Sequence, residues 1–309
     1  MNFVMLVGVP GSGKSTLAKK YAGEGWKIHS SDRVREELYG SEETQGKAAE
    51  VFQVLVQRAR KDLASGRPCV LDATNLRRKR RMQLLSPLSG LIEDPRCILV
   101  LAEPDTCEKH CLARDRVVPR EIIDQMILNY EPPYYYEGWK EIRTVYTGER
   151  YTFPRDQTIG FSQDNPYHSL TLDQHLTEAS RYCRLHQFSE EVQEAAWYHD
   201  IGKLYTKKFF NKAGLPTPYA HFYDHEACSA YLYLCEKAQE SASEDSWRRA
   251  LYIASLISWH MRPMTSWDRS VAARARDRKL IGEHMYAEIC QLHEADLAAH
   301  GPVEEREAE

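Results

Sequence analysis

Eight residues near the N-terminus have the types and the spacing needed to hold the phosphates of a nucleotide. The segment Gly8-Val9-Pro10-Gly11-Ser12-Gly13-Lys14-Ser15 fills every fixed position of the P-loop pattern G-x-x-x-x-G-K-[ST]. Glycines let backbone N–H groups approach phosphate oxygens, Lys14 brings a charge to the β- and γ-phosphates, and the hydroxyl of Ser15 suits Mg²⁺. We therefore expect ATP or another NTP, with Mg²⁺, to contact Gly8, Gly11, Ser12, Gly13, Lys14, Ser15 and Thr16.

Two later segments carry carboxylates that could serve the same phosphates. Asp32 and Arg35 are three residues apart at the start of an expected helix over residues 33–39, so they share a face of its first turn. A kinase needs a carboxylate that takes the proton of the attacking hydroxyl, which favours Asp32 as a base over a simple helix cap. Asp72 and Asn75 follow a short apolar run at residues 69–71, where open α/β sheets bind ligands.

The basic residues near this expected site can be interpreted in more than one way. Residues 77–81 form an unbroken run of five, which indicates either a solvated helix face or a surface that follows a phosphate backbone. Arg114 and Arg116 end an expected helix over residues 106–116, just before Val118-Pro119. Arginines on a mobile lid can close over a triphosphate and stabilise charge in the transition state.

A second set of chemical residues lies in the C-terminal half, on segments with helical patterns. It consists of imidazoles and carboxylates: His175, His199, Asp200, His225, His260 and Asp296. This mixture suits Mn, Fe, Co, Ni or Zn with open coordination positions. A single histidine of this kind would more often be a core residue, but six candidates on five helices favour a metal site.

The elements that must position these residues divide the chain in two. Alternating apolar runs and helical patterns predict an α/β domain over residues 1–150, with a parallel sheet and flanking helices. Gly, Pro and Ser interrupt every pattern in the next stretch, so residues 151–164 are expected to be a linker. Residues 165–309 predict an all-α bundle with helices over 172–186, 189–198, 225–238, 247–259 and 280–300.

Composition limits the partners and the location. The chain has 41 Lys and Arg against 45 Asp and Glu, so a nucleic-acid partner would need a local basic patch. The eight cysteines include no C-x-x-C pair, which indicates reduced thiols. No apolar run approaches twenty residues and no leader pattern opens the chain, so we expect a cytoplasmic protein without a membrane partner.

The first 150 residues resemble the kinase domain of polynucleotide 5′-hydroxyl kinases. That family follows its P-loop with an Asp and an Arg three residues later, a strand-borne D-x-T-N, an arginine-containing lid, V-P, and a segment ending in E-P-P and E-G. Here these are Asp32 and Arg35, residues 72–75, Arg114 and Arg116, residues 118–119, 131–133 and 137–138. The resemblance implies that Asp32 is the general base and that Arg35 contacts the acceptor phosphate. The lid arginines are more closely spaced than in the family.

The order H…HD…H…H…D in the second half resembles the HD-domain phosphohydrolases, and His199-Asp200-Ile201-Gly202-Lys203 matches their central motif. The resemblance implies a first metal on His175, His199, Asp200 and Asp296. It further implies that Asp200 bridges to a second metal on His225 and His260, and that Lys203 neutralises substrate charge. Arg262 is an expected additional phosphate contact, whereas His168, His221 and His300 are expected to be surface or supporting groups.

Together the two halves resemble an HD-type polynucleotide kinase-phosphatase that heals broken RNA. This resemblance implies NTP- and Mg²⁺-dependent phosphorylation of 5′-OH ends and metal-dependent removal of 2′,3′-cyclic or terminal phosphates, with RNA favoured over DNA and an RNA ligase as functional partner. One alternative is a small-molecule or nucleoside kinase fused to an HD nucleotide phosphohydrolase. Another is a non-enzymatic nucleotide sensor, which the intact Lys14, Asp32 and HD ligand set argue against.

Overall fold

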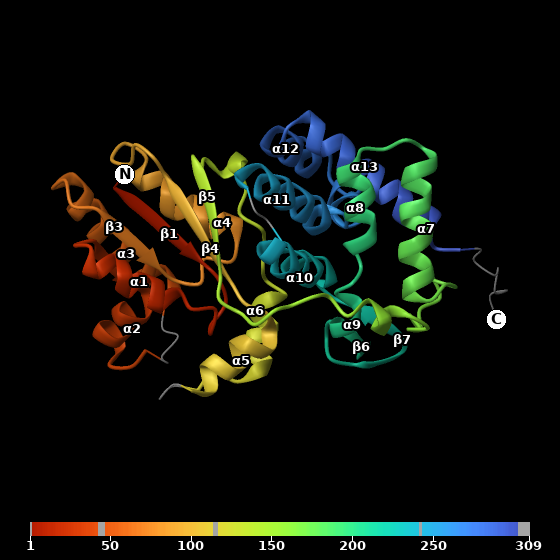
Figure 1. The fold of residues 1–309 in the computed structure, drawn as a ribbon, viewed down its shortest axis with the longest axis horizontal. Helices are drawn as coiled ribbons and strands as arrows, with labels where there is room; N and C mark the ends of the chain where they lie inside the picture. Colours follow the sequence, from red (N-terminus) through yellow and green to blue (C-terminus); the bar gives the residue numbers. More distant parts are fainter. Residues whose placement is uncertain (1, 43–46, 114–116, 241–242, 302–309) are drawn as a thin grey trace. The chain divides into compact units, whose positions relative to one another are not determined.

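The computed structural model describes residues 2–42, 47–113, 117–240 and 243–301. The chain forms two compact units (Figure 1). Unit 1 comprises residues 1–126 and 133–151, and unit 2 comprises residues 127–132 and 152–309. The short segment 127–132 belongs to unit 2 although it lies within the first half of the sequence. There Tyr130 is fully buried and packs edge-on against Tyr231, with ring centroids 5.2 Å apart.

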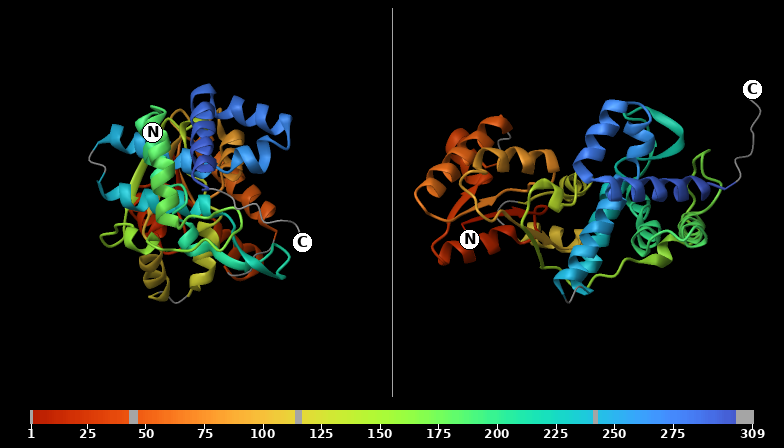
Figure 2. Two further views of the ribbon diagram at one scale, coloured as in Figure 1. Left: turned by 90° about the vertical axis from the view of Figure 1, so that its right-hand side faces the viewer. Right: turned by 90° about the horizontal axis from the view of Figure 1, so that it is seen from above.

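A five-stranded parallel sheet forms the centre of unit 1. Its strands are β1 (Phe3–Val7), β2 (Lys27–Ser30), β3 (Cys69–Asp72), β4 (Arg96–Leu101) and β5 (Glu141–Tyr146), in the order β2-β3-β1-β4-β5. Every residue of β1 is buried, although alternate side chains point to opposite faces. A strand that is apolar on both faces requires cover on both, and the helices of unit 1 lie on both sides of the sheet (Figure 2).

The helices of unit 1 follow the strands as the sequence predicts, with shifted ends. They are α1 (Lys14–Gly23), α2 (Ser31–Tyr39), α3 (Ala48–Ala64), α4 (Arg78–Leu85), α5 (Pro104–Leu112) and α6 (Arg120–Ile127), with single turns η1 (Ser86–Leu88) and η2 (Tyr135–Glu137). Ala18 of α1 packs on Val4 and Leu6 of β1 and on Val70 of β3. The parallel sheet with flanking helices is therefore confirmed.

Unit 2 is mostly helical, as the sequence predicts. Its helices are α7 (Leu172–Leu185), α8 (Glu190–Tyr198), α9 (Lys203–Thr206), α10 (His225–Glu240), α11 (Glu244–Trp259), α12 (Val271–Ile281) and α13 (Glu283–Ala298), with turns η3 (Arg155–Thr158) and η4 (Pro263–Trp267). The first twelve residues of α10, His225–Glu236, are buried almost without exception. A helix covered on all sides is typical of the centre of a bundle, and the neighbouring helices supply that cover.

The expectation of an all-α second half is wrong in one place. Strands β6 (Lys207–Phe210) and β7 (Pro216–Phe222) pair antiparallel as a hairpin. The aromatic residues of this segment favour a strand, and Gly214 has the positive φ of +80° that its turn requires. The hairpin is too short and irregular to show a clear alternating pattern, because a bulge between Lys208 and Phe210 shifts its register.

The segment expected to be a linker is folded into unit 2. The N–H of Phe153 donates to Oε2 of Glu236 at 2.8 Å, and Phe153 and Thr158 are buried. Gln163 is also buried, and its amide donates to the carbonyl of Leu170 at 3.1 Å. Residues 152–164 therefore pack as part of the second unit, and their Gly and Pro residues mark turns rather than a free connector.

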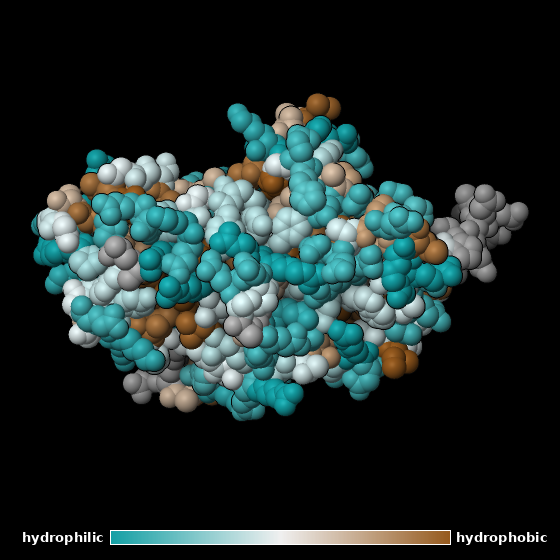
Figure 3. All heavy atoms as spheres, turned by 45° about the horizontal axis from the view of Figure 1, so that its top comes forward, coloured by the Kyte–Doolittle hydropathy of each residue, from teal (hydrophilic) through white to brown (hydrophobic). Residues whose placement is uncertain are grey.

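The molecule has no helix in its described parts that is long and apolar enough to cross a membrane. On the face drawn in Figure 3, hydrophobic residues form small separate patches among hydrophilic ones. All eight cysteines are free, and seven of them are buried. Burial raises the pKa of the Cys69 and Cys183 thiols to about 12, so these two side chains remain protonated near neutral pH.

Candidate functional sites

The backbone of the P-loop requires its glycines for two physical reasons. A Cβ on Gly8 would lie 2.4 Å from the carbonyl oxygen of Val100, and one on Gly11 would lie 2.1 Å from that of Cys107. Gly11 and Gly13 also have positive φ values of +80° and +92°. Gly13 precedes α1 without offering a side chain that could cap the helix, so a phosphate can bind at this N-terminus.

Side chains of the P-loop are arranged around the same helix start. Lys14 is buried, and its Nζ donates to the carbonyl of Val9 at 2.7 Å, so its ammonium lies against the loop. Ser15 and Thr16 are exposed in the first turn of α1. An exposed hydroxyl next to the loop is available to a Mg²⁺ ion that accompanies a nucleotide.

Two residues that the sequence patterns missed support the loop from other elements. Thr147, directly after β5, donates its hydroxyl to the carbonyl of Ser12 at 2.9 Å. Nδ1 of His110 in α5 lies 2.8 Å from the carbonyl of Gly11 and donates to it. No motif marks either residue, because they act on backbone carbonyls from distant positions in the sequence.

Asp32 lies at the same edge of the sheet as the P-loop. Ser30 at the end of β2 pairs with Asp72 of β3, and Asp72 pairs with Leu6 of β1. Two strand spacings of about 5 Å each therefore separate the end of β2, two residues before Asp32, from the strand that leads into the P-loop. The side chain of Asp32 is 51% exposed, and Arg35 donates to its Oδ1 at 2.7 Å. A substrate hydroxyl could therefore reach this carboxylate.

The side chain of Asn75 is buried and bonded to the backbone, whereas a side chain that contacts a nucleotide directly would be exposed at the site. It is 2% exposed with φ of 48°, and its Nδ2 donates to the carbonyl of Leu6 at 2.8 Å. The neighbouring carbonyl of Thr74 accepts from Gly8 N at 3.0 Å. Asn75 thus ties the loop after β3 to the strand that carries the P-loop, while Asp72 is buried at the end of β3. Arg114 and Arg116, the expected lid arginines, lie outside the described residues.

The run of basic residues 77–81 does not form one solvated surface. Arg81 is completely buried, and Nε and Nη2 donate to the two carboxylate oxygens of Glu137 at 2.7 and 2.6 Å. Its Nη1 donates to the carbonyls of Asn75 and Leu76 at 3.0 and 2.7 Å. Arg80 lies over the ring of Phe52, 4.1 Å from its centroid. A reading of all five residues as a phosphate-binding surface is therefore wrong for Arg81.

Replacing Arg81 with Met should destabilise the fold by about 3–5 kcal/mol, because it leaves the buried carboxylate of Glu137 without its charged partner. Lys79→Met on the same helix is the control, since Lys79 is exposed and should change stability by less than about 0.5 kcal/mol. Urea unfolding of both variants measures the difference. Equal stabilities would show that the pair does not support the loop after β3.

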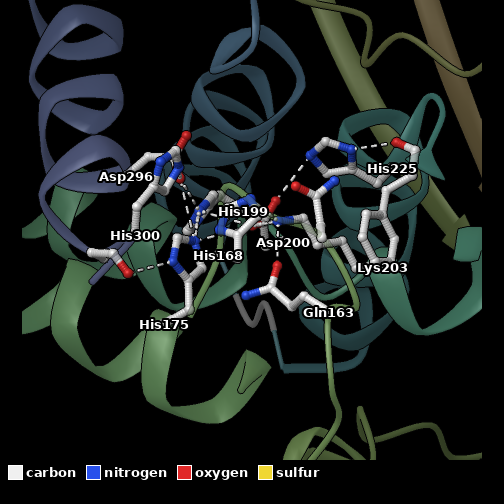
Figure 4. A network of polar contacts seen from close by, with 12 residues as sticks. Gln163, His168, His175, His199, Asp200, Lys203, His225, Asp296 and His300 are labelled. Atoms are coloured by element: carbon white, nitrogen blue, oxygen red, sulfur yellow. Dashed lines mark hydrogen bonds and ion pairs between the residues drawn. The ribbon is translucent and has the colours of Figure 1, made fainter. Parts of the chain in front are cut away.

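The six candidate metal ligands of unit 2 converge from different elements, and all of them except His260 are labelled in Figure 4. His175 lies in α7, His199 and Asp200 follow α8, His225 begins α10, His260 follows α11, and Asp296 lies in α13. All six are at least 94% buried. Two groups have ligand atoms within 4.8 Å of one another: His175, His199, Asp200 and Asp296 form the first, and Asp200, His225 and His260 form the second.

Backbone carbonyls fix the tautomer of every histidine in the two groups. Nδ1 lies 3.0 Å from the carbonyl of Ala299 in His175, 2.9 Å from that of Ala196 in His199, 2.7 Å from that of Phe222 in His225, and 2.7 Å from that of Ile257 in His260. A carbonyl can only accept, so each Nδ1 carries the hydrogen. Each Nε2 then faces the cluster and has a lone pair when its imidazole is neutral, which is the arrangement of metal-ligating imidazoles.

Asp200 joins the two groups through its two carboxylate oxygens. Oδ2 lies 3.1 Å from Nε2 of His175 and 3.4 Å from Nε2 of His199. Oδ1 lies 2.9 Å from Nε2 of His225 and 3.7 Å from Nε2 of His260. The Nε2 atoms of His175 and His199 are 3.1 Å apart, and those of His225 and His260 are 3.3 Å apart. Donor atoms this close together can share one cation in place of a proton, so the residues fit two divalent ions, with Asp200 offering one oxygen to each group.

The charges of the cluster also suit cations. Burial raises the pKa of Asp200, but Lys203 and the nearby histidines outweigh burial and hold the pKa well below its usual range. Burial likewise raises the pKa of Asp296, and hydrogen bonds from His175, His199 and His300 lower it further than burial raises it. Burial, together with His199 and His225, lowers the pKa of His260 to about 3. The pKa of His175 moves the other way, because burial lowers it but hydrogen bonds to Asp200 and Asp296 raise it to about 9. Two buried carboxylates that stay ionised attract cations, and a metal ion at His175 would replace the proton on its Nε2.

Further polar side chains surround the first group. Nζ of Lys203 lies 2.6 Å from Oδ2 of Asp200 and donates to Oε1 of Gln163 at 2.7 Å. His300 lies 3.5 Å from Oδ1 of Asp296, and its ring is 4.3 Å from that of His168. The sequence patterns missed Gln163 because it lies in the segment expected to be a linker. Arg262, which the sequence predicts as a phosphate contact, lies near Asp277, with 4.0 Å between Nη1 and Oδ2.

Comparisons with known proteins bear on unit 1. Residues 3–133 match the model of a family described as AAA domain, whereas no curated protein matches the chain. The match includes the P-loop and four of the five strands, so unit 1 contains a P-loop domain similar to that family.

Several solved structures are similar to about half of the chain. A putative kinase from Chloroflexus aurantiacus J-10-fl is 19% identical, with a TM-score of 0.38, over 48% of this chain and 88% of that chain. A gluconokinase from Sinorhizobium meliloti 1021 is 19% identical, with a TM-score of 0.36, over 49% of this chain and 84% of that one. A sugar kinase from Janibacter sp. HTCC2649 is 16% identical, with a TM-score of 0.37, over 49% and 87%.

Proposed function

We propose that the protein is a bifunctional enzyme that heals RNA ends, with a 5′-hydroxyl polynucleotide kinase in unit 1 and a metal-dependent 2′,3′-cyclic phosphodiesterase and 2′(3′)-phosphatase in unit 2. The observation that carries the proposal is the bridging position of Asp200 between two groups of ligands in a chain that also has a P-loop. The resemblance to HD-type kinase-phosphatases connects the two chemistries to the two ends of one break.

The kinase reaction would use the residues at the carboxyl edge of the sheet. The P-loop, with Lys14 and a Mg²⁺ held by Ser15, would position the triphosphate of ATP or another NTP. The 5′-oxygen of the acceptor forms a bond to the γ-phosphorus while the bond to the β–γ bridging oxygen breaks and NDP leaves. Asp32 takes the proton of the 5′-hydroxyl, and Arg35 holds the carboxylate or an acceptor phosphate.

The hydrolase reaction would use the cluster in unit 2. One or two divalent transition metals, of the Mn, Ni, Co, Zn or Fe type, supply Lewis acidity toward a phosphate ester and acidify water when bound. The first would be held by His175, His199, Asp200 and Asp296, and the second by Asp200, His225 and His260. Lys203 brings a buried ammonium to the same place, where it neutralises charge on the phosphate, and Gln163 holds it there.

One observation supports a second candidate, a small-molecule kinase fused to an HD nucleotide phosphohydrolase. The basic run 77–81 favours a polynucleotide acceptor, but Arg81 is buried and bonded to Glu137, so the exposed basic surface is smaller than the sequence indicates. Transfer of labelled phosphate from ATP to a 5′-OH oligoribonucleotide, compared with transfer to nucleosides and sugars, separates the two. Transfer only to small molecules would overturn the proposed polynucleotide kinase.

A further inference from the structure

The segment that joins two of the ligand positions in unit 2 has an unusual composition. Between Asp200 and Asp224 the chain has four lysines, six aromatic residues and no carboxylate. This segment contains α9 and the β6–β7 hairpin, and it runs directly into His225. The candidate metal ligands Asp200 and His225 border this segment, but metal binding does not account for the lysines and aromatic rings between them. Lysine and exposed aromatic rings together are typical of surfaces that bind single-stranded nucleic acid.

One face of the hairpin displays a row of rings. Tyr219, His221 and Tyr223 are spaced by two residues, so they point to the same face of an extended chain. The rings of His221 and Tyr223 are stacked, with centroids 5.3 Å apart and an interplanar angle of 8°. Tyr219 is 45% exposed at the outer end of the row. We call these three residues the ring row.

Two lysines lie beside the ring row. Lys208 pairs with His221 across the hairpin, and cross-strand partners place their side chains on the same face. Lys212 lies over the ring of Tyr223, with Nζ 5.3 Å from the ring centroid. Ammonium groups at the border of a row of rings can contact phosphates while bases stack on the rings.

The ring row is tied to the metal cluster by a short connection. The carbonyl of Phe222, which lies between His221 and Tyr223 in the sequence, accepts from Nδ1 of His225 at 2.7 Å. Nζ of Lys203 lies 5.3 Å from the ring centroid of Phe222 on the way to Asp200. Because Phe222 alternates with His221 and Tyr223, its ring points to the opposite face of the strand from the ring row. The ring row therefore lies on the outer face of the segment that leads into the candidate ligand His225.

We propose that the ring row, with Lys208 and Lys212, binds the unpaired nucleotides next to the phosphate-bearing 3′ end of an RNA strand. The proposal rests on the proposed hydrolase function and makes it more specific, because it assigns unit 2 to polynucleotide ends rather than to free nucleotides. The absence of carboxylates from residues 201–223 favours a polyanion over a protein segment as the occupant.

The test measures binding and hydrolysis separately in the full chain. The probe is a single-stranded decaribonucleotide with a 3′-phosphate and a 5′-fluorescein, which blocks the end that the kinase would use. Tyr219→Ala with His221→Ala, and separately Lys208→Ala with Lys212→Ala, should each weaken binding at least about fivefold by fluorescence anisotropy. The lysine pair should also reduce the salt dependence of binding.

Controls separate this role from damage to the cluster. Arg269→Ala with Lys279→Ala removes two exposed positive charges elsewhere in unit 2 and should leave binding unchanged. Tyr219→Leu keeps an apolar side chain but removes the aromatic ring and its hydroxyl, so it should also weaken binding. Metal content and hydrolysis of a 2′,3′-cyclic mononucleotide should stay at the wild-type level in all variants.

The outcomes distinguish this proposal from the function on which it rests. Unchanged RNA affinity in both double variants, or an equal loss in the control pair, would overturn the ring row as a binding surface. If the wild type binds the RNA through the ring row but hydrolyses neither substrate, the proposed hydrolase fails while the binding surface stands. Equal losses on the oligonucleotide and the mononucleotide would overturn the proposal in favour of a structural role.

Discussion

Replacing His199 and Asp200 together with Ala is expected to remove the bound metal from unit 2 and to reduce phosphate release more than about 100-fold, while phosphorylation of a 5′-OH end continues. The loss exceeds that caused by replacing a residue that only hydrogen-bonds to a ligand, which costs about 10–100-fold, because here two ligands are removed. Asp200 contributes an oxygen to each group, so both metals depend on it. Elemental analysis of the metal and separate assays on 5′-OH and 2′,3′-cyclic phosphate strands measure the effect.

The matched control changes the same residue types on the surface of unit 2. His284 and Asp268 have side chains that are 83% and 64% exposed, so His284→Ala with Asp268→Ala should keep both activities and the metal. Loss of both activities in the His199 and Asp200 variant, with circular dichroism still native, would contradict two independent sites. It would point instead to a shared or coupled one.

Single substitutions sharpen the same prediction because the two carboxylates differ in position. Asp200→Asn should lower the metal content of both groups, whereas Asp296→Asn should affect only the first, since Asp296 belongs to that group alone. Titration of the apo variants with Mn²⁺ and counting of bound ions distinguish the two cases. The same stoichiometry in both variants would exclude a bridging role for Asp200.

The residues of the two candidate sites are easier to recognise in the sequence than the residues that surround them, and the reason is physical. A P-loop and an H…HD…H…H…D series are recognisable because few residue types can cradle a phosphate or ligate a metal, whatever the fold around them. The parallel sheet is predictable for a similar reason, because strands covered on both faces must be apolar throughout, as β1 is. Neither the motifs nor the apolar strands require knowledge of which residues, far apart in the sequence, come into contact in the fold.

The features that the sequence does not predict depend on contacts between residues that are far apart in the sequence. Arg81 looks like its four basic neighbours, and only the folded chain shows that it is buried and paired with Glu137, 56 residues away. Gln163 lies among Gly, Pro and Ser residues that indicate a linker, but it holds the ammonium of Lys203. Thr147 and His110 support the P-loop through its carbonyls, which have no sequence signature. The β6–β7 hairpin is not predicted, because a bulge interrupts the alternation of side chains that would indicate a strand.

Replacing Asp32 with Asn is expected to slow phosphoryl transfer to a 5′-OH by about 10²–10⁴-fold while nucleotide binding stays near the wild-type level. Asparagine keeps the shape of the side chain and can still accept a hydrogen bond from Arg35, but it cannot take a proton. Single-turnover transfer and the affinity for a fluorescent ATP analogue are measured on the same preparations.

Two further variants test whether the effect of Asp32→Asn arises from the loss of a general base. Glu36→Gln removes a carboxylate from the exposed surface of the same helix and should leave transfer unchanged. Lys14→Ala should weaken nucleotide binding as well as transfer, because Lys14 lies inside the loop that would hold the phosphates. A variant of Asp32 that transfers phosphate within a few-fold of the wild-type rate would remove the carboxylate from the mechanism. An equal loss of nucleotide affinity would place it at the triphosphate rather than at the acceptor, because a base for the 5′-hydroxyl acts only on the acceptor.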